Sequence, residues 1–258
     1  MKHTWKAALA VATVAMIGTA GAAKADLTLD GQTGLFANPT AEVLKKGASE
    51  VQVNYNRLSA EGEHVSDIGA GFAFSPLDKL ELSANTDRLS VEGEHLSTSR
   101  LGLKYQFINQ ADKGFDVAAG VNYGSVYVLD QWTVYAAATK AFNLSHNRAP
   151  VKGTLGVRWD RFSEYGYSES KASVYGGAEV PLTSDGKFSL VGELGSKIFD
   201  YGQSTYAIGL RYHPQASGFS IGAGYGRIAS SGIGSILAAE SGENFHNFFV
   251  QASYNFGK

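Results

Sequence analysis

Acidic and histidine side chains gather twice in this sequence, in the stretches "NRLSAEGEHVS" (56–66) and "DRLSVEGEHLS" (87–97), 31 residues apart. Side chains of these types are metal ligands when their geometry is fixed. Nothing in this spacing fixes a geometry, and Glu-Gly suits a two-residue hairpin turn. We therefore interpret them as exposed charges at two hairpin tips and predict no metal and no cofactor. The candidate ligands are Glu61, Glu63, His64, Glu92, Glu94 and His95.

A second candidate chemistry is lipid hydrolysis by Ser59 as nucleophile and His246 as base. The two residues lie near opposite ends of the chain, so they meet only if the first and last strands pair. No enzyme-family signature surrounds either residue, and a histidine near a membrane interface is commonly part of an amphipathic rim. We predict that the protein is not an enzyme and keep a lipid hydrolase as a remote alternative.

The segments that carry these residues are predicted to be strands, because apolar and polar residues alternate with a period of two. In "HNFFVQASYNF" (246–256) and "LGLKYQF" (101–107), every second residue is apolar. About twelve such segments follow one another, separated by turns rich in Gly, Pro, Asn and Asp. They begin near Glu50, Asp67, Leu80, Arg100, Phe115, Trp132, Val151, Ser173, Phe188, Thr205, Phe219 and Asn247.

The repeated stretch predicts the register of two hairpins. A turn centred on Glu61-Gly62 sets Tyr55 opposite Ile68, with two further apolar pairs below it. A turn centred on Glu92-Gly93 sets Ala84 opposite Leu101. Turn position and apolar pattern agree, as they must when one face of a strand is buried or faces lipid.

Strand number and loop lengths favour a transmembrane antiparallel up-and-down β-barrel over residues 49–258. Its connections alternate between short turns and longer loops, and aromatic residues gather near the strand ends. The alternative is a soluble β-sandwich or lipocalin-like barrel with its apolar face inside. The other face, however, carries many glycines and charges, and unpaired charges cannot be buried in a sandwich core without large cost.

Residues 1–25 resemble a secretory signal peptide. Lys2 and Lys6 precede the apolar run "AALAVATVAMIG", and "AKA" (23–25) is a small-residue cleavage site. Cleavage there leaves 19 basic against 24 acidic residues, a net charge of −5, which argues against nucleic acid as a partner. There is no cysteine. We expect a monomer in the outer membrane that contacts outer-membrane lipid and meets the barrel assembly machinery during insertion.

The stretch "NPTAEVLKKG" (38–47) predicts a short helix. Asn38 suits the N-cap, Pro39 the first helical position and Gly47 the left-handed stop. So short a helix is unstable alone and must dock on the barrel. We predict that residues 26–48 form a plug or periplasmic lid, with a disordered lead-in as the alternative. The docking residues are Leu35, Phe36, Pro39, Val43 and Leu44.

Charged residues on the inner face nearly balance in sign. A selective channel presents a ring of one sign, whereas balanced charges suggest ion pairs that brace the lumen. Twelve strands lie between filled small barrels and wide porins, so the lumen is either a narrow channel or obstructed. The predicted lumen charges are Glu81, Asp87, Arg100, Lys104, Asp116, Arg158, Asp160, Glu179, Glu193, Lys197 and Arg211.

Three arginines, Arg57, Arg88 and Arg161, are predicted to face outward just above the apolar band. Guanidinium groups at this height suit the phosphates of lipopolysaccharide. Ordinary solvated rim charge is the alternative.

The stretch "TGLFANPTAEVLKKGASEVQVNYNR" (33–57) resembles the opening of the YjbH-type outer-membrane barrel proteins. The matching positions are Gly34, Leu35, Pro39, Thr40, Ala41 and Gly47. The resemblance implies a plugged barrel and a link to exopolysaccharide secretion, although that family is larger. We therefore expect a plugged or narrow barrel with a structural or export-accessory role, with a passive porin for small solutes as the alternative.

Overall fold

The computed structural model describes most of the chain beyond residue 25. The described residues are 26–60, 63–91, 94–126, 129–144, 149–164, 167–196, 204–214, 217–227 and 246–257.

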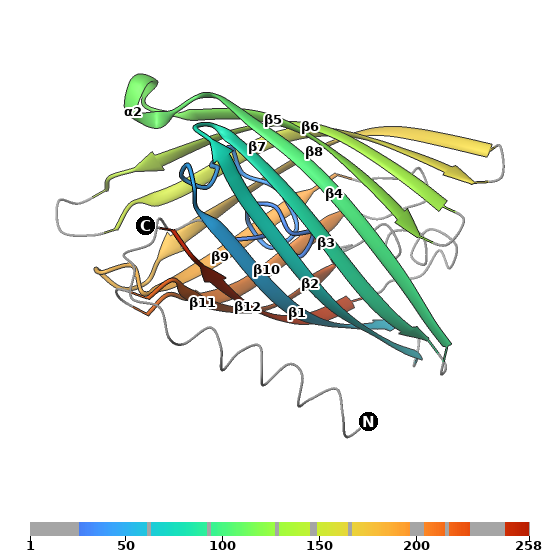
Figure 1. The fold of residues 1–258 in the computed structure, drawn as a ribbon. Helices are drawn as coiled ribbons and strands as arrows, with labels where there is room; N and C mark the ends of the chain where they lie inside the picture. The colour runs from blue at the N-terminus through green and yellow to red at the C-terminus, as the bar shows by residue number, and fades with distance from the viewer. Residues whose placement is uncertain are drawn as a thin grey trace.

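Twelve antiparallel strands of the described residues close into one barrel, in which each strand pairs with its sequence neighbours and β1 pairs with β12 (Figure 1). The predicted all-β barrel is therefore confirmed. The strands are β1 (Ser49–Ala60), β2 (Glu63–Leu77), β3 (Leu80–Val91), β4 (Glu94–Ile108), β5 (Asp116–Val126), β6 (Leu129–Phe142), β7 (Val151–Glu164), β8 (Tyr167–Pro181), β9 (Phe188–Gly195), β10 (Thr205–Tyr212), β11 (Phe219–Arg227) and β12 (His246–Asn255).

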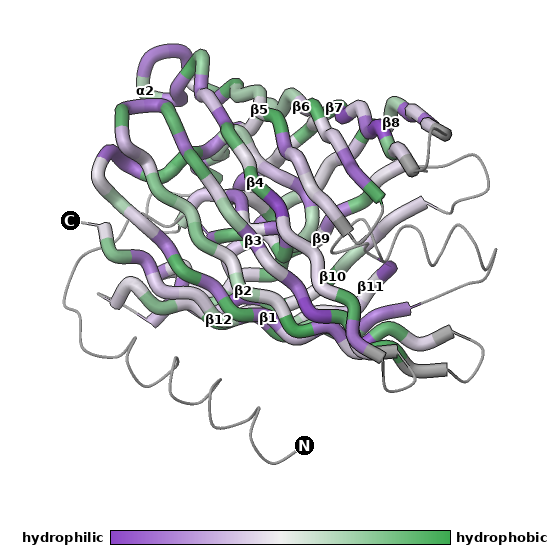
Figure 2. The backbone as a smooth tube through the Cα atoms, turned by 45° about the vertical axis from the view of Figure 1, so that its right-hand side comes forward, coloured by the Kyte–Doolittle hydropathy of each residue, from purple (hydrophilic) through white to green (hydrophobic). Residues whose placement is uncertain are grey.

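The predicted hairpin registers are confirmed. Tyr55 pairs with Ile68, and Ala84 pairs with Leu101. Strands β2, β4 and β8 begin four to six residues earlier than predicted, because their hairpins continue beyond the apolar band. Hydrophobic and hydrophilic residues alternate along the strands (Figure 2).

The apolar residues of this alternation point outward. Leu101, Leu155 and Leu194 are 64%, 73% and 69% exposed, whereas alternate residues such as Glu81 and Asp160 are buried inside. The barrel thus has a polar interior and an apolar exterior, the reverse of a soluble sandwich.

One end of the barrel, where β1 begins and β12 ends, is here called the terminal end, and the opposite end is called the loop end. Several connections at the terminal end are compact. They include the Asp78-Lys79 turn and the four-residue helix α2 (Gln110–Lys113), capped by Asn109 and by the left-handed Gly114. No helix among the described residues is long and apolar enough to cross a membrane.

Residues 26–48, here the N-terminal segment, lie inside the barrel (Figure 1). The predicted helix over 38–47 is wrong, since this stretch has no helical hydrogen bonding. It runs as irregular backbone with isolated bridges between Leu27 and Thr33 and between Gly34 and Pro39. Gly47 does adopt the positive φ expected of it, 79°, but it ends no helix.

Inward-facing aromatic rings lie over glycines of the neighbouring strand. Tyr175 pairs with Gly156, and a Cβ added at Gly156 would lie 2.1 Å from the Tyr175 ring. Tyr135 covers Gly120 and Phe249 covers Gly224 in the same way. The missing side chain is what lets each ring lie flat against the wall and leaves the centre of the lumen to the N-terminal segment.

We predict that Gly156→Ala destabilises the barrel by about 1–3 kcal/mol, because the new methyl group displaces the Tyr175 ring. The measurement is the midpoint of thermal unfolding in detergent. Gly153→Ala on the same strand is the control, because its Cβ would meet only Phe142 at an ordinary 3.5 Å. Equal midpoints for the two variants would contradict this account of the glycine.

Candidate functional site in the barrel lumen

The N-terminal segment makes seven backbone–backbone hydrogen bonds within itself, and its remaining peptide groups need partners on the barrel wall. Buried backbone N–H and C=O groups are nearly always paired in native proteins. Here charged and amide side chains of the inner face supply most of these partners.

Glu81 and Lys104 bind the middle of the N-terminal segment from β3 and β4. The Glu81 carboxylate accepts hydrogen bonds from the backbone N–H groups of Thr33 (3.0 Å) and Leu44 (3.1 Å). Lys104 Nζ lies 3.4 Å from Glu81 and donates to the carbonyl oxygens of Thr33 and Glu42, both at 2.8 Å. Both side chains are 1% exposed. This buried ion pair therefore binds peptide groups of both polarities.

On the opposite wall, Glu193 of β9 and Arg211 of β10 likewise bind N–H and C=O groups of the segment. The Glu193 carboxylate accepts from the N–H groups of Ala37 (2.8 Å) and Asn38 (3.1 Å) and from the Asn38 side-chain amide (2.9 Å). Arg211 donates to the Leu35 carbonyl at 3.1 Å, and its guanidinium lies 5.2 Å from the centre of the Phe36 ring. Asn38 thus uses the side chain expected to cap a helix to bind the wall instead.

Neutral side chains complete the attachment along the segment. Tyr175 OH donates to the Pro39 carbonyl at 3.0 Å, and Thr139 Oγ1 accepts from the Ala41 N–H at 2.9 Å. The side-chain amides of three residues donate to carbonyl oxygens of the segment at 2.9–3.0 Å. They are Gln52 to Thr28, Asn85 to Leu29 and Gln106 to Ala41.

Three acidic residues of the segment pair with basic residues of the barrel. Asp30 pairs with Arg100, Glu42 lies 2.7 Å from Lys152, and Asp26 lies 3.2 Å from Arg211. Burial alone would raise the pKa of Asp26, but Arg211 and His213 outweigh it and hold that pKa below its usual value. Asp26 is therefore ionised at neutral pH.

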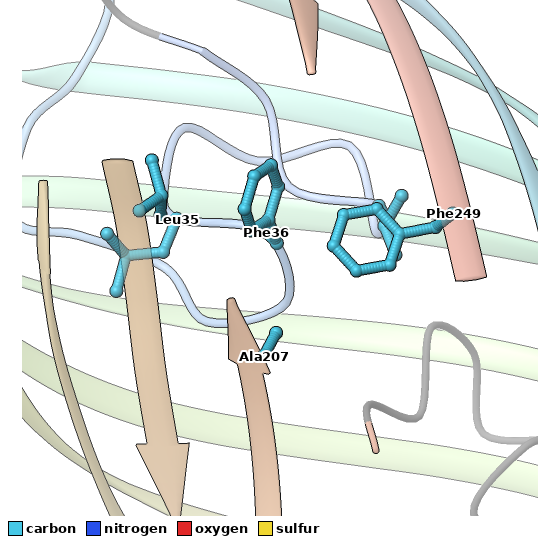
Figure 3. Packing of buried hydrophobic residues seen from close by; sticks show 6 residues of the cluster. Leu35, Phe36, Ala207 and Phe249 are labelled. Atoms are coloured by element: carbon cyan, nitrogen blue, oxygen red, sulfur yellow. The ribbon is translucent and has the colours of Figure 1, made fainter. Parts of the chain in front are cut away.

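Apolar contacts hold the centre of the segment (Figure 3). Phe36 packs edge-on against Phe249 of β12 with ring centroids 4.7 Å apart, beside Leu35 and Ala207. Of the docking residues expected from the sequence, Leu35, Phe36, Pro39 and Leu44 are buried and Val43 is half-buried. Leu44 packs in a second cluster with Leu27, Ala48 and Ala73.

Five further predicted lumen charges form hydrogen bonds or ion pairs with other residues of the barrel. Asp116 accepts from the Gln110 backbone N–H at the terminal end (2.7 Å), and Asp87 accepts from Thr98 (3.2 Å). Arg158 and Asp160 form an ion pair at 2.6 Å, and Glu179 lies 3.4 Å from Arg211. Lys197 lies outside the described residues.

Two small cavities lie between the segment and the wall. One cavity beside Asp30, Arg100 and Tyr135 has a volume of about 20 Å³, and another beside Asp26, Lys152 and Glu179 has about 10 Å³. Each has room for about one water molecule. A larger apolar groove of about 1610 Å³ lies on the outer wall against exposed residues such as Leu155, Val174 and Leu194.

The other candidate residues lie away from the lumen. Arg57, Arg88 and Arg161 are exposed on the outer wall, each near the loop end of its strand. Ser59 and His246 are paired across β1 and β12, as strand closure requires. His246 Nδ1 lies 3.2 Å from the Tyr206 hydroxyl, where a hydrolase would place a carboxylate.

Of the candidate metal ligands at the hairpin tips, only the His95 side chain lies within the described residues. Among the described residues no group of three acidic or histidine side chains is placed to hold an ion. His95 Nδ1 lies 3.0 Å from Ser90 Oγ. Glu61 and Glu92 lie outside the described residues, as do the side chains of Glu63, His64 and Glu94.

The acidic residues of the N-terminal segment that pair with the barrel were not predicted from the sequence. Asp26, Asp30 and Glu42 form ion pairs with barrel residues, and none was selected from the sequence. Phe249 was also missed, although it is an aromatic residue on an otherwise polar face of its strand. An apolar ring on a lumen face is the signal that something apolar, here Phe36, must cover it.

Comparisons with known proteins identify the class of fold. No protein-family profile and no curated protein sequence matches this chain. Among solved structures, it is similar to the KdgM porin (13% identity, 79% of this chain and 98% of the other, TM-score 0.52) and to the NanC porin (10%, 79% and 98%, 0.57). An outer membrane channel from Pseudomonas putida F1 matches at 15% identity over 84% and 98%, with a TM-score of 0.50. The chain therefore has the fold of outer-membrane β-barrel porins and channels.

We predict that Glu193→Ala loosens the segment around Ala37 and Asn38, because three donors lose their acceptor at once. A buried donor left unpaired costs about 1–3 kcal/mol, so amide exchange of residues 37–38 should rise by roughly 5- to 100-fold. Hydrogen exchange with mass spectrometry measures this. The control is Asp185→Ala, which removes a surface ion pair with Lys187 and should leave residues 37–38 unchanged. Unaltered exchange in Glu193→Ala would show that the carboxylate does not hold the segment.

Proposed function

We propose that this protein is an outer-membrane β-barrel that is closed at rest by its own N-terminal segment and has no enzymatic activity. The observation that carries the proposal is the pairing of this segment's backbone with buried charges of the wall, above all Glu81, Lys104, Glu193 and Arg211. The outward apolar band supports insertion into a membrane, and the porin fold supports the outer membrane.

The magnitude of the attachment favours a closed barrel over a passive pore. If the bonds outweigh the entropy cost of ordering the segment by about 3 kcal/mol, roughly one molecule in a hundred is open. The segment makes more than three such bonds, and it also buries Leu35 and Phe36. Opening would thus require a partner or a ligand that competes for the wall.

A structural or export-accessory role fits a barrel of this kind. The resemblance of residues 33–57 to YjbH-type proteins supports a link to cell-surface polysaccharide. The structure explains why glycine stands at position 34, one of the matching positions. A Cβ there would lie 2.5 Å from the Asn38 carbonyl oxygen. The glycine of the motif is therefore also required by a tight turn of the segment.

A passive porin is the second candidate, supported by the fold of the KdgM and NanC porins. The KdgM porin has also been solved in complex with disordered oligogalacturonate, an acidic sugar chain. In this chain, departure of the segment would leave Arg100, Lys104 and Arg211 lining the lumen together with Glu81, Glu179 and Glu193, a balanced set that favours neither sign of solute.

Single-channel conductance in a planar bilayer separates the two candidates. We expect the intact protein, refolded from residue 26 onward, to be silent, and a variant lacking residues 31–47 to conduct in steps. The deletion removes Phe36, Asn38 and Leu44 together with their contacts, while β1 to β12 remain.

Steady steps from the intact protein would make it a pore and overturn the closed-barrel proposal. Silence from both proteins would leave the segment without a gating role and point to a purely structural barrel. Thermal unfolding of the deletion variant serves as the control that the barrel itself has formed.

We also propose that Arg57, Arg88 and Arg161 bind lipopolysaccharide phosphates at the loop end. Replacing all three with Ala should reduce the affinity for purified lipopolysaccharide at least tenfold, because each guanidinium offers charge-assisted hydrogen bonds to phosphate. The measurement is the rise in unfolding midpoint on titration with lipopolysaccharide. The control is Lys140→Ala, an exposed cation that lies over Phe142 toward the terminal end. An equal loss in the control would indicate general charge attraction only.

A further inference from the structure

A buried carboxylate lies where the N-terminal segment passes into the first strand, and its hydrogen-bond partners are neutral. Glu50 of β1 is fully buried. It accepts from the backbone N–H of Leu27 (3.3 Å) and from the side-chain amide of Asn255 (3.2 Å). Within the part of the chain that the structure describes, no basic side chain lies within 4 Å of it.

The surroundings of Glu50 are acidic. Asp26 and Glu81 both act on it electrostatically, and Arg211, the cation that also acts on Glu50, is shared between Asp26 (3.2 Å) and Glu179 (3.4 Å). His213 also faces Asp26, at 3.1 Å. A buried carboxylate that forms no ion pair of its own is unfavourable when ionised, so an added positive charge beside Glu50 would stabilise its ionised form.

The predicted signal-peptide cleavage would create a positive charge at this place. Water would add across the Ala25–Asp26 peptide bond, leaving a carboxylate on Ala25 and an amino group on Asp26. An α-amino group has an ordinary pKa of about 7.7–8.0 and is mostly protonated at neutral pH. Because the Leu27 nitrogen is 3.3 Å from Glu50, the neighbouring Asp26 nitrogen lies within about 7 Å of the same carboxylate.

We propose that the new α-ammonium group of Asp26 binds Glu50 in the lumen and that cleavage thereby completes the attachment of the N-terminal segment. Before cleavage the same nitrogen is a neutral amide, and the leader continues from a residue that is only 6% exposed. Seating of the segment is then coupled to removal of the leader. This inference rests on the predicted cleavage site and does not depend on whether the barrel conducts.

The test begins with the mature protein purified from outer membranes, whose N-terminal residue is read by mass spectrometry. The α-amino group is then acetylated selectively in denaturant near pH 6.5, where lysines are far less reactive because their pKa is about 10.4. After refolding, acetylation should lower the midpoint of thermal unfolding by about 3–6 °C. In Glu50→Gln the shift should fall to less than half, because the partner charge is already gone.

Glu42→Gln is the matched control, since it removes a carboxylate of the segment that pairs with Lys152 instead, and it should keep the full acetylation shift. If Glu50→Gln does not refold, the acetylation rate of the folded wild-type protein is measured instead. Its α-amino group should then acetylate at least tenfold more slowly than the exposed Lys45 and Lys46, relative to the unfolded chain.

An N-terminus other than Asp26, equal acetylation shifts in wild type and Glu50→Gln, or fast acetylation of the folded protein would each overturn the proposal. Conductance of the intact barrel would not, because it bears on the closed-barrel proposal alone.

Discussion

The whole arrangement depends on one constraint: an irregular peptide segment buried inside a barrel must find a partner for nearly every N–H and C=O group. Glu81 and Glu193 accept the N–H groups, and Lys104 and Arg211 donate to the carbonyl oxygens. Charged hydrogen-bond partners are stronger than neutral ones, and they work best where water is excluded. The balanced charge of the inner face is therefore explained by the two polarities of the peptide group that it binds.

Barrel size makes this segment necessary. Twelve strands enclose more space than the inner side chains fill, since many of them are glycine or small. Where a large ring does face inward, as at Tyr175 and Phe249, it lies flat over a glycine of the next strand. The rings then form part of the wall that the segment packs against, through Pro39 and Phe36.

The barrel could be predicted from the sequence because its signal is local and repeated. Alternation and turn position agreed on the pairing of Tyr55 with Ile68, and one such hairpin constrains the next. The N-terminal segment could not be predicted in the same way. The cap rules applied to Asn38, Pro39 and Gly47 consider only neighbours in sequence, whereas the partner of Asn38 is Glu193, 155 residues away. A ten-residue helix is marginal in water, so tertiary contacts of this kind readily displace it.

These contacts also decide what kind of opening is physically reasonable. The wall binds mainly the backbone of the segment, so a side-chain change in the segment alone removes few of the bonds. Withdrawal of the segment, by contrast, would strip Glu81, Lys104, Glu193 and Arg211 of their peptide partners together. Two of these charges, Glu81 and Lys104, already form a buried ion pair with each other, whereas Glu193 forms no ion pair among the described residues. The wall around Glu193 is therefore the side on which an empty lumen would be least stable, and where water or a polar solute would stabilise it most.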